Sequence, residues 1–314
     1  MDMTHNKCCR HGANLRRRRR RRRKILRSII FSYSIIAVAV FVAVGSSMIR
    51  SGDGRKNRYD VEAGNNTYDN AVIENSKISE KNKIQNNQSM LDDIMNSTQY
   101  PKQLKDLALK NEEALEFVYD YPAEHVKEHT IDLTEEASMD SVPLFVQWDK
   151  RWGYEKYSGN FFAASGCGPT TLSMVVVYLT HDREASPIAV AKYSKEAGYS
   201  VDGSGSSWTL ISEGCRHYGV KAKAVALDES RMKAELDEGH PIVVNVGPGD
   251  FTDTGHFMVI TGYDDEGFSI NDPNSIEKSG KRWLFKNISS QIRAVWSMYV
   301  LEYICISAGK TSYY

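Results

Sequence analysis

The chain changes three times in how hydrophobic and polar residues alternate. Residues 28–49 form a run of 22 residues without a charged side chain. In residues 102–118, apolar residues recur partly at spacings of three and four, which predicts one amphipathic helix that ends at Tyr121-Pro122. After residue 141, short apolar runs alternate with glycines and aromatic residues, a pattern typical of a compact fold.

Within this last region, the helical pattern precedes the strand pattern. Helices are expected at 169–179, 187–197 and 208–218, the last of them stopped by Gly219, and strands at 241–246, 256–263, 267–270 and 297–303. Helices followed by strands indicate the α+β class. We therefore expect one catalytic domain at 141–305, followed by a C-terminal tail at 306–314.

The first 49 residues predict a membrane anchor. Of the 40 Lys and Arg residues, 12 lie in residues 1–27, which leaves 28 basic against 39 acidic residues in the remainder. An arginine run alone would suit nucleic acid, but about 20 apolar residues behind it span a bilayer. Because basic residues stay on the cytoplasmic side, 1–27 is expected to be a cytoplasmic tail, 28–49 a single-pass signal-anchor, and the remainder extracellular. A signal peptide cleaved near Ala43-Val44-Gly45-Ser46 is the alternative; nucleic acid is not an expected partner.

Two segments connect the predicted anchor to the catalytic domain. Residues 50–101 are rich in Asn, Ser, Lys and Glu and poor in aromatics, which predicts a flexible stalk. Residues 102–140 are expected to form a helical arm against the catalytic domain, with a coiled-coil stalk or a propeptide as alternatives. Cys215 and Cys305 are expected to be ordinary buried cysteines, although a disulfide between them remains open.

Cys167 is the candidate nucleophile. It lies in Ser165-Gly166-Cys167-Gly168-Pro169-Thr170, immediately before the first predicted helix of the catalytic domain. A helix N-terminus offers unpaired N–H groups and a partial positive charge, which favour the thiolate over the thiol. The flanking glycines let a substrate carbonyl approach closely, and the Cys167 N–H is a candidate oxyanion donor.

His256 and Asp272 are the candidate base and its partner. His256 opens one predicted strand, and the next strand returns through a turn at Asp264-Asp265-Glu266-Gly267 to Asn271-Asp272-Pro273. In an antiparallel hairpin, both residues fall toward the open end, where Asp272 can orient the imidazole of His256. A thiol, an imidazole and a third polar group make up an activated nucleophile. Gln147 is a candidate second oxyanion donor through its side-chain amide.

These motifs occur in the order of a known family. The segments Gln147-Trp148-Asp149-Lys150-Arg151-Trp152, 165–170, Gly255-His256-Phe257 and 271–273 resemble the peptidase family thirty-nine-like group, papain-fold relatives of the bacteriocin-leader-processing peptidases. The resemblance covers about residues 141–303. It implies a papain-like fold, a Cys167–His256–Asp272 triad, and a contribution of Gln147 to the oxyanion hole.

The chain departs from the leader-processing peptidases in two respects. Their glutamine precedes the cysteine by only a few residues, whereas Gln147 lies twenty residues before Cys167. The chain also shows no transporter or nucleotide-binding segment, so leader processing coupled to export is not expected.

The expected function is hydrolysis of a peptide or protein substrate by an extracytoplasmic cysteine peptidase. A peptidoglycan amidase or endopeptidase, an acyltransferase and a non-catalytic surface binding module are the alternatives. No cofactor or metal is expected, because His125 and His129 lack the H-E-x-x-H arrangement. Trp208 is expected either to line a substrate groove or to pack in the core. The oligomeric state is not readable from the sequence.

Overall fold

The structure is a computed structural model that describes residues 66–301, with side chains from residue 80 onward. The described residues from 71 onward belong to one compact unit. The predicted tail at 1–27, span at 28–49 and C-terminal tail at 306–314 lie outside the described residues. No helix within 66–301 is long and apolar enough to cross a membrane.

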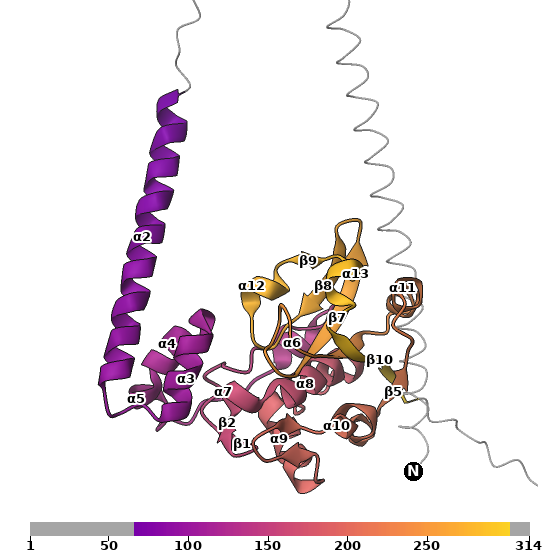
Figure 1. Ribbon diagram of the computed structural model, residues 1–314. Helices are drawn as coiled ribbons and strands as arrows, with labels where there is room; N and C mark the ends of the chain where they lie inside the picture. The colour runs from indigo at the N-terminus through magenta and orange to yellow at the C-terminus, as the bar shows by residue number, and fades with distance from the viewer. Residues whose placement is uncertain (1–65, 302–314) are drawn as a thin grey trace, which may run out of the picture. The chain divides into compact units, whose positions relative to one another are not determined.

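The described chain begins with helices over residues 66–138, and short helices and strands follow from residue 156 onward (Figure 1). The helices are α2 (Asn66–Asn96), α3 (Lys102–Lys110), η1 (Glu112–Ala114), α4 (Leu115–Tyr119), α5 (Tyr121–Glu124), α6 (Thr134–Ser138), α7 (Phe162–Ser165), α8 (Cys167–Thr180), α9 (Pro187–Glu196), α10 (Thr209–Ser212), η2 (Gly214–Tyr218), α11 (Glu229–Asp237), α12 (Ile276–Ser279) and α13 (Phe285–Ile288). The strands are β1 (Lys156–Tyr157), β2 (Asn160–Phe161), β3 (Ser200–Val201), β4 (Gly205–Ser206), β5 (Val220–Ala224), β6 (Ile242–Val246), β7 (His256–Asp264), β8 (Gly267–Asn271), β9 (Arg282–Trp283) and β10 (Ile292–Val300).

A six-stranded antiparallel sheet forms the C-terminal half of the unit. Its strand order is β5-β10-β6-β7-β8-β9, and β1-β2 and β3-β4 form two small separate hairpins. Every residue of β6 is buried, which agrees with its unbroken apolar run. Its alternate side chains point into different clusters, with Val243 toward α8 and Val244 toward α11. The sheet is therefore covered on both faces around its centre. The fold combines helices with an antiparallel sheet, as expected of the α+β class, but α11, α12 and α13 lie between strands of this sheet along the chain.

Helix α8 is the central helix of the domain. Its side chains from Thr170 to Tyr178 are buried between α9 and the sheet. α9 begins after Ser186, whose hydroxyl accepts the Ala189 N–H, so both predicted helices in this part of the chain are confirmed. The third, expected at 208–218, is instead two short pieces, α10 and η2, that end at Gly219 with φ of 69°.

The segment expected to be a flexible stalk contains the helix α2. Its 31 residues include neither glycine nor proline, and helix formation does not require an apolar stripe along the whole length. At its C-terminal end, Ile94 is fully buried, with Met90 and Leu91 packed around it. Full burial of one isoleucine contributes about 1.5–3 kcal/mol. Residues 66–96 are thus helical where the composition indicates a flexible segment, and the role of residues 50–101 as a stalk stays a prediction.

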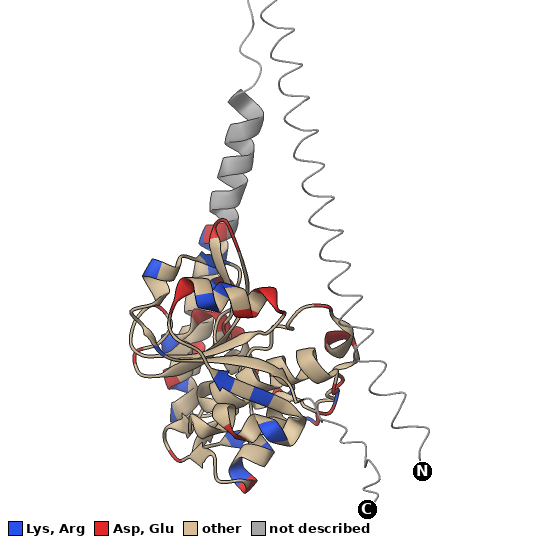
Figure 2. Cartoon of the chain, turned by 90° about the vertical axis from the view of Figure 1, so that its right-hand side faces the viewer, with Lys and Arg blue, Asp and Glu red and all other residues tan. Residues whose placement is uncertain are grey.

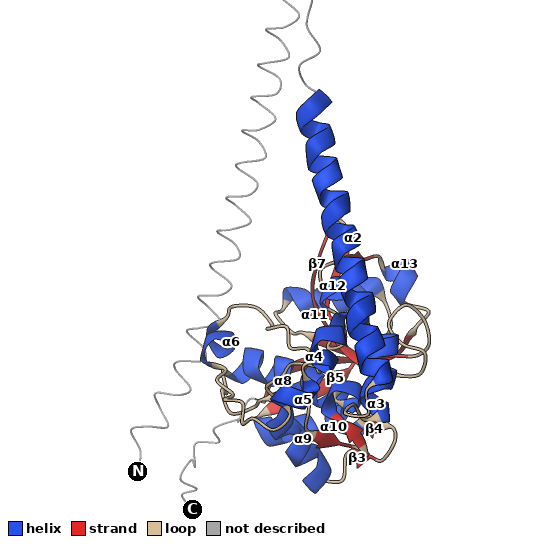
Figure 3. Cartoon of the chain, turned by 90° about the vertical axis from the view of Figure 1, so that its left-hand side faces the viewer, coloured by secondary structure: helices blue, strands red, loops and turns tan. Residues whose placement is uncertain are grey.

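The arm is a group of short helices rather than the single helix expected at 102–118 (Figure 3). Asn111 interrupts it with extended backbone angles of −137° and 98°, and its side chain accepts the Glu113 N–H. Leu104, Leu115 and Phe117 of the arm share a buried cluster with Phe161, which precedes the Cys167 motif. The arm therefore packs directly against the segment that leads to the candidate nucleophile.

Charges of both signs are interspersed over the described elements (Figure 2). Among them, Lys150 pairs with Asp120 of the arm at 2.5 Å, and the Tyr154 hydroxyl donates to the Phe117 carbonyl at 2.7 Å. These polar contacts add to the apolar contact between the arm and the catalytic domain.

Candidate active site

Cys167 is the first residue of α8. Pro169 falls in the first turn, where its missing N–H leaves no hydrogen bond unmade, and the helix continues to Thr180. The first N–H groups of an α-helix have no partner within the helix. A side chain at Gly168 would come within 2.6 Å of the Ser206 hydroxyl, so this glycine allows the β3-β4 hairpin to approach the nucleophile. Cys167 is therefore partly buried, with the β3-β4 hairpin packed close to it.

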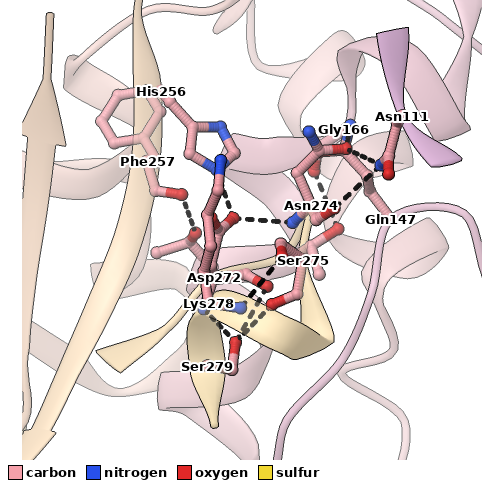
Figure 4. Close-up of polar contacts among 12 residues, drawn as sticks. Asn111, Gln147, Gly166, His256, Phe257, Asp272, Asn274, Ser275, Lys278 and Ser279 are labelled. Atoms are coloured by element: carbon pink, nitrogen blue, oxygen red, sulfur yellow. Dashed lines mark hydrogen bonds and ion pairs between the residues drawn. The ribbon is translucent and has the colours of Figure 1, made fainter. Parts of the chain in front are cut away.

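His256 and Asp272 meet at the open end of the β7-β8 hairpin (Figure 4). His256 Nε2 lies 2.7 Å from Asp272 Oδ1, and the side chains are 7% and 1% exposed. The geometry expected from the two strands and their turn is therefore confirmed. Because Nε2 of His256 binds the Asp272 carboxylate, Nδ1 is the ring nitrogen that can interact with the Cys167 thiol.

The buried pair perturbs the titration of both reactive groups. Burial alone would raise the pKa of the Cys167 thiol, but the hydrogen bond and charge of His256, with the backbone N–H groups of Phe257 and Gly168, lower it below its usual value. Burial would lower the pKa of His256, yet the charge and hydrogen bond of Asp272, assisted by Cys167, raise it to about 10. A thiolate beside an imidazolium is the arrangement that these two shifts favour.

A hydrogen bond joins the helix of the nucleophile to the strand of the base. Thr171 Oγ1, one turn along α8 from Cys167, donates to the Phe257 carbonyl at 3.1 Å. Phe257 follows His256 directly, and both are buried. This contact fixes the distance between α8 and β7 where the thiol and the imidazole face each other.

The turn that carries Asp272 is held from within and by neighbouring loops. Asp272 Oδ1 accepts the Asn274 N–H at 2.8 Å, and the Asp272 N–H donates to Ser279 Oγ at 2.9 Å. Gln147 N donates to the Pro273 carbonyl at 2.7 Å. The carboxylate orientation therefore depends on the path of the backbone from 272 to 279.

The arm also binds this turn. Asn111 Nδ2 donates to the Asn274 carbonyl at 2.9 Å. The Glu113 carboxylate accepts a hydrogen bond from the Ser275 hydroxyl and from the N–H groups of Ile276 at 2.7 Å and Glu277 at 3.0 Å. Figure 4 shows Asn111 reaching the turn from a separate part of the chain. Two arm residues thus hold the backbone that presents Asp272.

The side-chain amide of Gln147 is engaged within the protein. Its side chain is buried, and Nε2 donates to the Ala163 carbonyl at 2.7 Å and to Asn274 Oδ1 at 3.3 Å. In this arrangement, the amide links the segment before the nucleophile to the turn of Asp272. The oxyanion role expected of Gln147 stays a prediction.

A family model places this arrangement among known proteins. The model of the Peptidase_C39 like family matches residues 139–302, slightly more than half of the 314-residue chain. The chain belongs to this family. It is accordingly a cysteine-type peptidase, with a peptide or protein as its substrate class.

Two solved structures are similar to part of the chain. One is the peptidase domain of Streptococcus ComA, described as a bi-functional ABC transporter involved in a quorum-sensing pathway, with 19% identity, 51% of this chain and 97% of that chain covered, and a TM-score of 0.38. The other is a Bacillus anthracis protein described as a C39-like peptidase, with 15% identity, 51% and 95% covered, and a TM-score of 0.32. No curated protein gives a significant match to the sequence.

The cavity around Cys167 has a volume of about 680 Å³. Trp208 lines it together with Asn160 and Asn245, two residues that the sequence did not point out. Trp208 is 47% exposed, which supports the groove-lining alternative over the core-packing one. Asn160 lies seven residues before Cys167, and its Oδ1 accepts the Phe161 N–H at 2.7 Å. The short spacing between glutamine and cysteine in the leader-processing peptidases was the one signal that could have directed attention to Asn160.

The other candidate groups remain apart from this site. Cys215 is a buried free thiol, and burial raises its pKa to about 11. Cys305 lies outside the described residues, so a disulfide between the two cysteines stays an open alternative. In the part of the chain that the structure describes, no group of three or more His, Cys, Asp or Glu side chains is arranged to hold a metal ion.

Proposed function

We propose that the chain is a membrane-anchored extracytoplasmic cysteine peptidase with Cys167, His256 and Asp272 as its catalytic triad. The observation that carries the proposal is the buried His256–Asp272 pair beside a thiol of lowered pKa at a helix N-terminus. The Asp272 carboxylate binds Nε2 of His256, which orients the imidazole and stabilises the imidazolium form of His256. His256 in turn keeps Cys167 as a thiolate at neutral pH.

The reaction follows from these positions. The thiolate attacks the carbonyl carbon of the scissile amide, and the tetrahedral intermediate collapses to a thioester as the imidazolium of His256 protonates the leaving amine. Neutral His256 then takes a proton from water, which attacks the thioester and releases the acid together with the thiolate. The amide bond is thus exchanged for a thioester bond to Cys167, and the thioester bond is then exchanged for a bond to the oxygen of water.

The negative oxygen of the intermediate needs hydrogen-bond donors. The backbone N–H of Cys167 is one, because it belongs to the unpaired first turn of α8. Asn160 is proposed as the second, since its side chain lines the same cavity and its Nδ2 remains available there. Gln147 is the alternative second donor, the role that the sequence predicts for it.

Site-resolved alkylation tests the nucleophile. The full chain is treated with iodoacetamide at neutral pH, and mass spectrometry measures the modified fraction of each cysteine. Cys167 is expected to react far faster than Cys215, whose pKa is raised to about 11. Cys167→Ala should abolish peptide hydrolysis, while Cys215→Ala, the matched control, should retain it. Equal hydrolysis by wild type and Cys167→Ala would contradict the assignment.

The membrane part of the proposal rests on the uncharged run at 28–49 behind the basic tail. On intact cells, a membrane-impermeant maleimide is expected to reach Cys167 but to reach Cys8 and Cys9 only after permeabilisation. The chain should stay with membranes after alkaline extraction. A mature chain that begins near Ser46 would instead support the cleaved signal peptide, and labelling of Cys8 on intact cells would contradict the orientation.

A further inference from the structure

The cavity around Cys167 has a single charged residue among the described residues that line it. One wall comes from 158–165 and 203–208, the other from 245–257 together with Arg293, and Gln103 of α3 adds to the rim. The remaining lining residues are glycines and uncharged side chains. The charge of Arg293 is therefore a specific feature of the groove.

The backbone of β10 places Arg293 at this position. The pairing of β10 with β6 shifts between Ile292 and Ala294, so Arg293 lies at a bulge. A bulge redirects a side chain and is common beside active sites. The bulge thus turns one residue of a core strand toward the cavity.

Gly247 provides the space for the guanidinium. A Cβ built at Gly247 would lie 2.5 Å from Arg293 Nε and 2.9 Å from Nη2, so the guanidinium rests directly on this glycine. The Gly247 N–H donates to the Gln291 carbonyl at 2.8 Å, which fixes the backbone beneath it. Any side chain at 247 would displace the guanidinium from its seat.

Among the described residues, 66–301, none makes a hydrogen bond or ion pair with the Arg293 guanidinium. In contrast, Arg282 at the sheet edge pairs with Asp264 Oδ2 at 2.6 Å, and Arg151 pairs with Asp149 at 2.8 Å. Asp250, in the loop beside the cavity, already accepts from Gln291 Nε2 at 2.6 Å. The five N–H donors of Arg293 are thus available to a ligand.

We propose that Arg293 binds a carboxylate of the substrate close to the scissile bond. A planar guanidinium matches a carboxylate with two parallel hydrogen bonds. Cys167 and Arg293 line the same cavity, so the carboxylate lies near the bond to be cut. The carboxylate is an Asp or Glu side chain near that bond, or a nearby C-terminus. This inference rests on the proposed function and specifies its substrate class.

Cleavage preference gives the first test. The full-length chain is incubated with a proteome-derived peptide library, and mass spectrometry identifies the residues flanking each new terminus. Synthetic pairs then compare Glu with Gln at the preferred position, and a free with an amidated C-terminus, which separates the two carboxylate sources. Wild type is expected to cleave the carboxylate member about tenfold more efficiently in kcat/KM, the effect of a charged hydrogen bond reduced by solvent exposure.

Three variants assign this preference to the guanidinium. Arg293→Gln should bring the ratio close to one, and Arg293→Glu should favour a Lys peptide over the Glu peptide. Gly247→Ala, which displaces the guanidinium, should weaken the ratio while Arg293 remains. Arg282→Gln is the matched control because this arginine lies outside the cavity; it should keep the wild-type ratio.

The outcomes separate the two proposals. Cleavage by wild type without a carboxylate preference, or an unchanged preference in Arg293→Gln, would overturn the role of Arg293 and leave the peptidase function intact. If wild type cleaved no peptide, the peptidase proposal would fail. Calorimetric binding of the Glu and Gln peptides to Cys167→Ala, with and without Arg293→Gln, would then decide the Arg293 inference: an equal affinity for both peptides would overturn it.

Discussion

Removal of the Glu113 carboxylate tests whether the arm tunes the catalytic carboxylate. In Glu113→Ala, the Ser275 hydroxyl and the N–H groups of Ile276 and Glu277 lose their acceptor. Loss of a comparable helix cap costs about 0.5–2 kcal/mol. For a unit of this size, about 1 kcal/mol lowers the melting temperature by roughly 2–4 °C. We therefore expect a moderate decrease in Tm and a folded enzyme at 25 °C.

The effect on catalysis should be larger than the effect on stability. A misplacement of about 1 Å at a catalytic group can reduce the rate about 100-fold, so a partly released Asp272 turn should lower kcat roughly 10- to 100-fold. Because Asp272 raises the pKa of His256, its displacement should lower that pKa and raise the pKa of the Cys167 thiol. Glu113 does not line the cavity, so any rise in KM should come only from weaker docking of the arm, which brings Gln103 to the cavity.

The assay combines kcat and KM for peptide hydrolysis with the pH dependence of Cys167 alkylation, both measured well below Tm. Glu112→Ala is the matched control. Glu112 is exposed and accepts a hydrogen bond from Asn87 at 2.7 Å, away from the Asp272 turn. Alkylation and kcat within twofold of wild type in Glu113→Ala would refute the reasoning, as would an equal loss in the control.

Three further predictions follow from the site. The stabilisation from charged His256 is fully present below about pH 6.5 and is lost as the pH rises through about 10, so hydrolysis should fall across that upper limit. In Asp272→Asn, this alkaline limb of the kcat/KM profile should move to lower pH; an unmoved limb would contradict the pairing. Asn160→Ala should reduce kcat about 100- to 1,000-fold at nearly unchanged Tm, whereas Gln147→Ala should mainly lower Tm, and the reverse pattern would restore the oxyanion role to the glutamine. Thr171→Val should cost about 1 kcal/mol in urea unfolding, and a value near zero would show that its hydrogen bond to β7 adds nothing.

Local patterns predicted the elements that bring the site together. The apolar run behind Cys167 predicted α8, and the turn at 264–267 predicted the hairpin that joins His256 to Asp272. Both depend on side-chain periodicity and turn residues within about 20 positions of each other. Such short-range signals are visible in a single sequence.

Contacts between distant residues account for most of the differences. Asn111 interrupts the predicted arm helix, and its amide bonds Asn274, 163 positions away. Gln147 has its amide engaged by Ala163 and Asn274, which no motif spacing could indicate. The helix α2 escaped prediction for another reason: its polar composition resembles that of a disordered segment, although nothing in it prevents a helix.

The presence of Gln103 at the rim of the cavity has a thermodynamic consequence. Gln103 belongs to α3, so a ligand that fills the cavity touches the arm as well as the catalytic domain. A ligand that prefers the docked arm stabilises docking by RT ln(1 + [L]/Kd), about 2.7 kcal/mol at 100 times Kd. By reciprocity, whatever holds the arm in place raises the affinity for that ligand by the same factor. Substrate binding and docking of the arm are thus coupled, and each favours the other. Protection of the α3 amides from hydrogen exchange should therefore increase with peptide concentration.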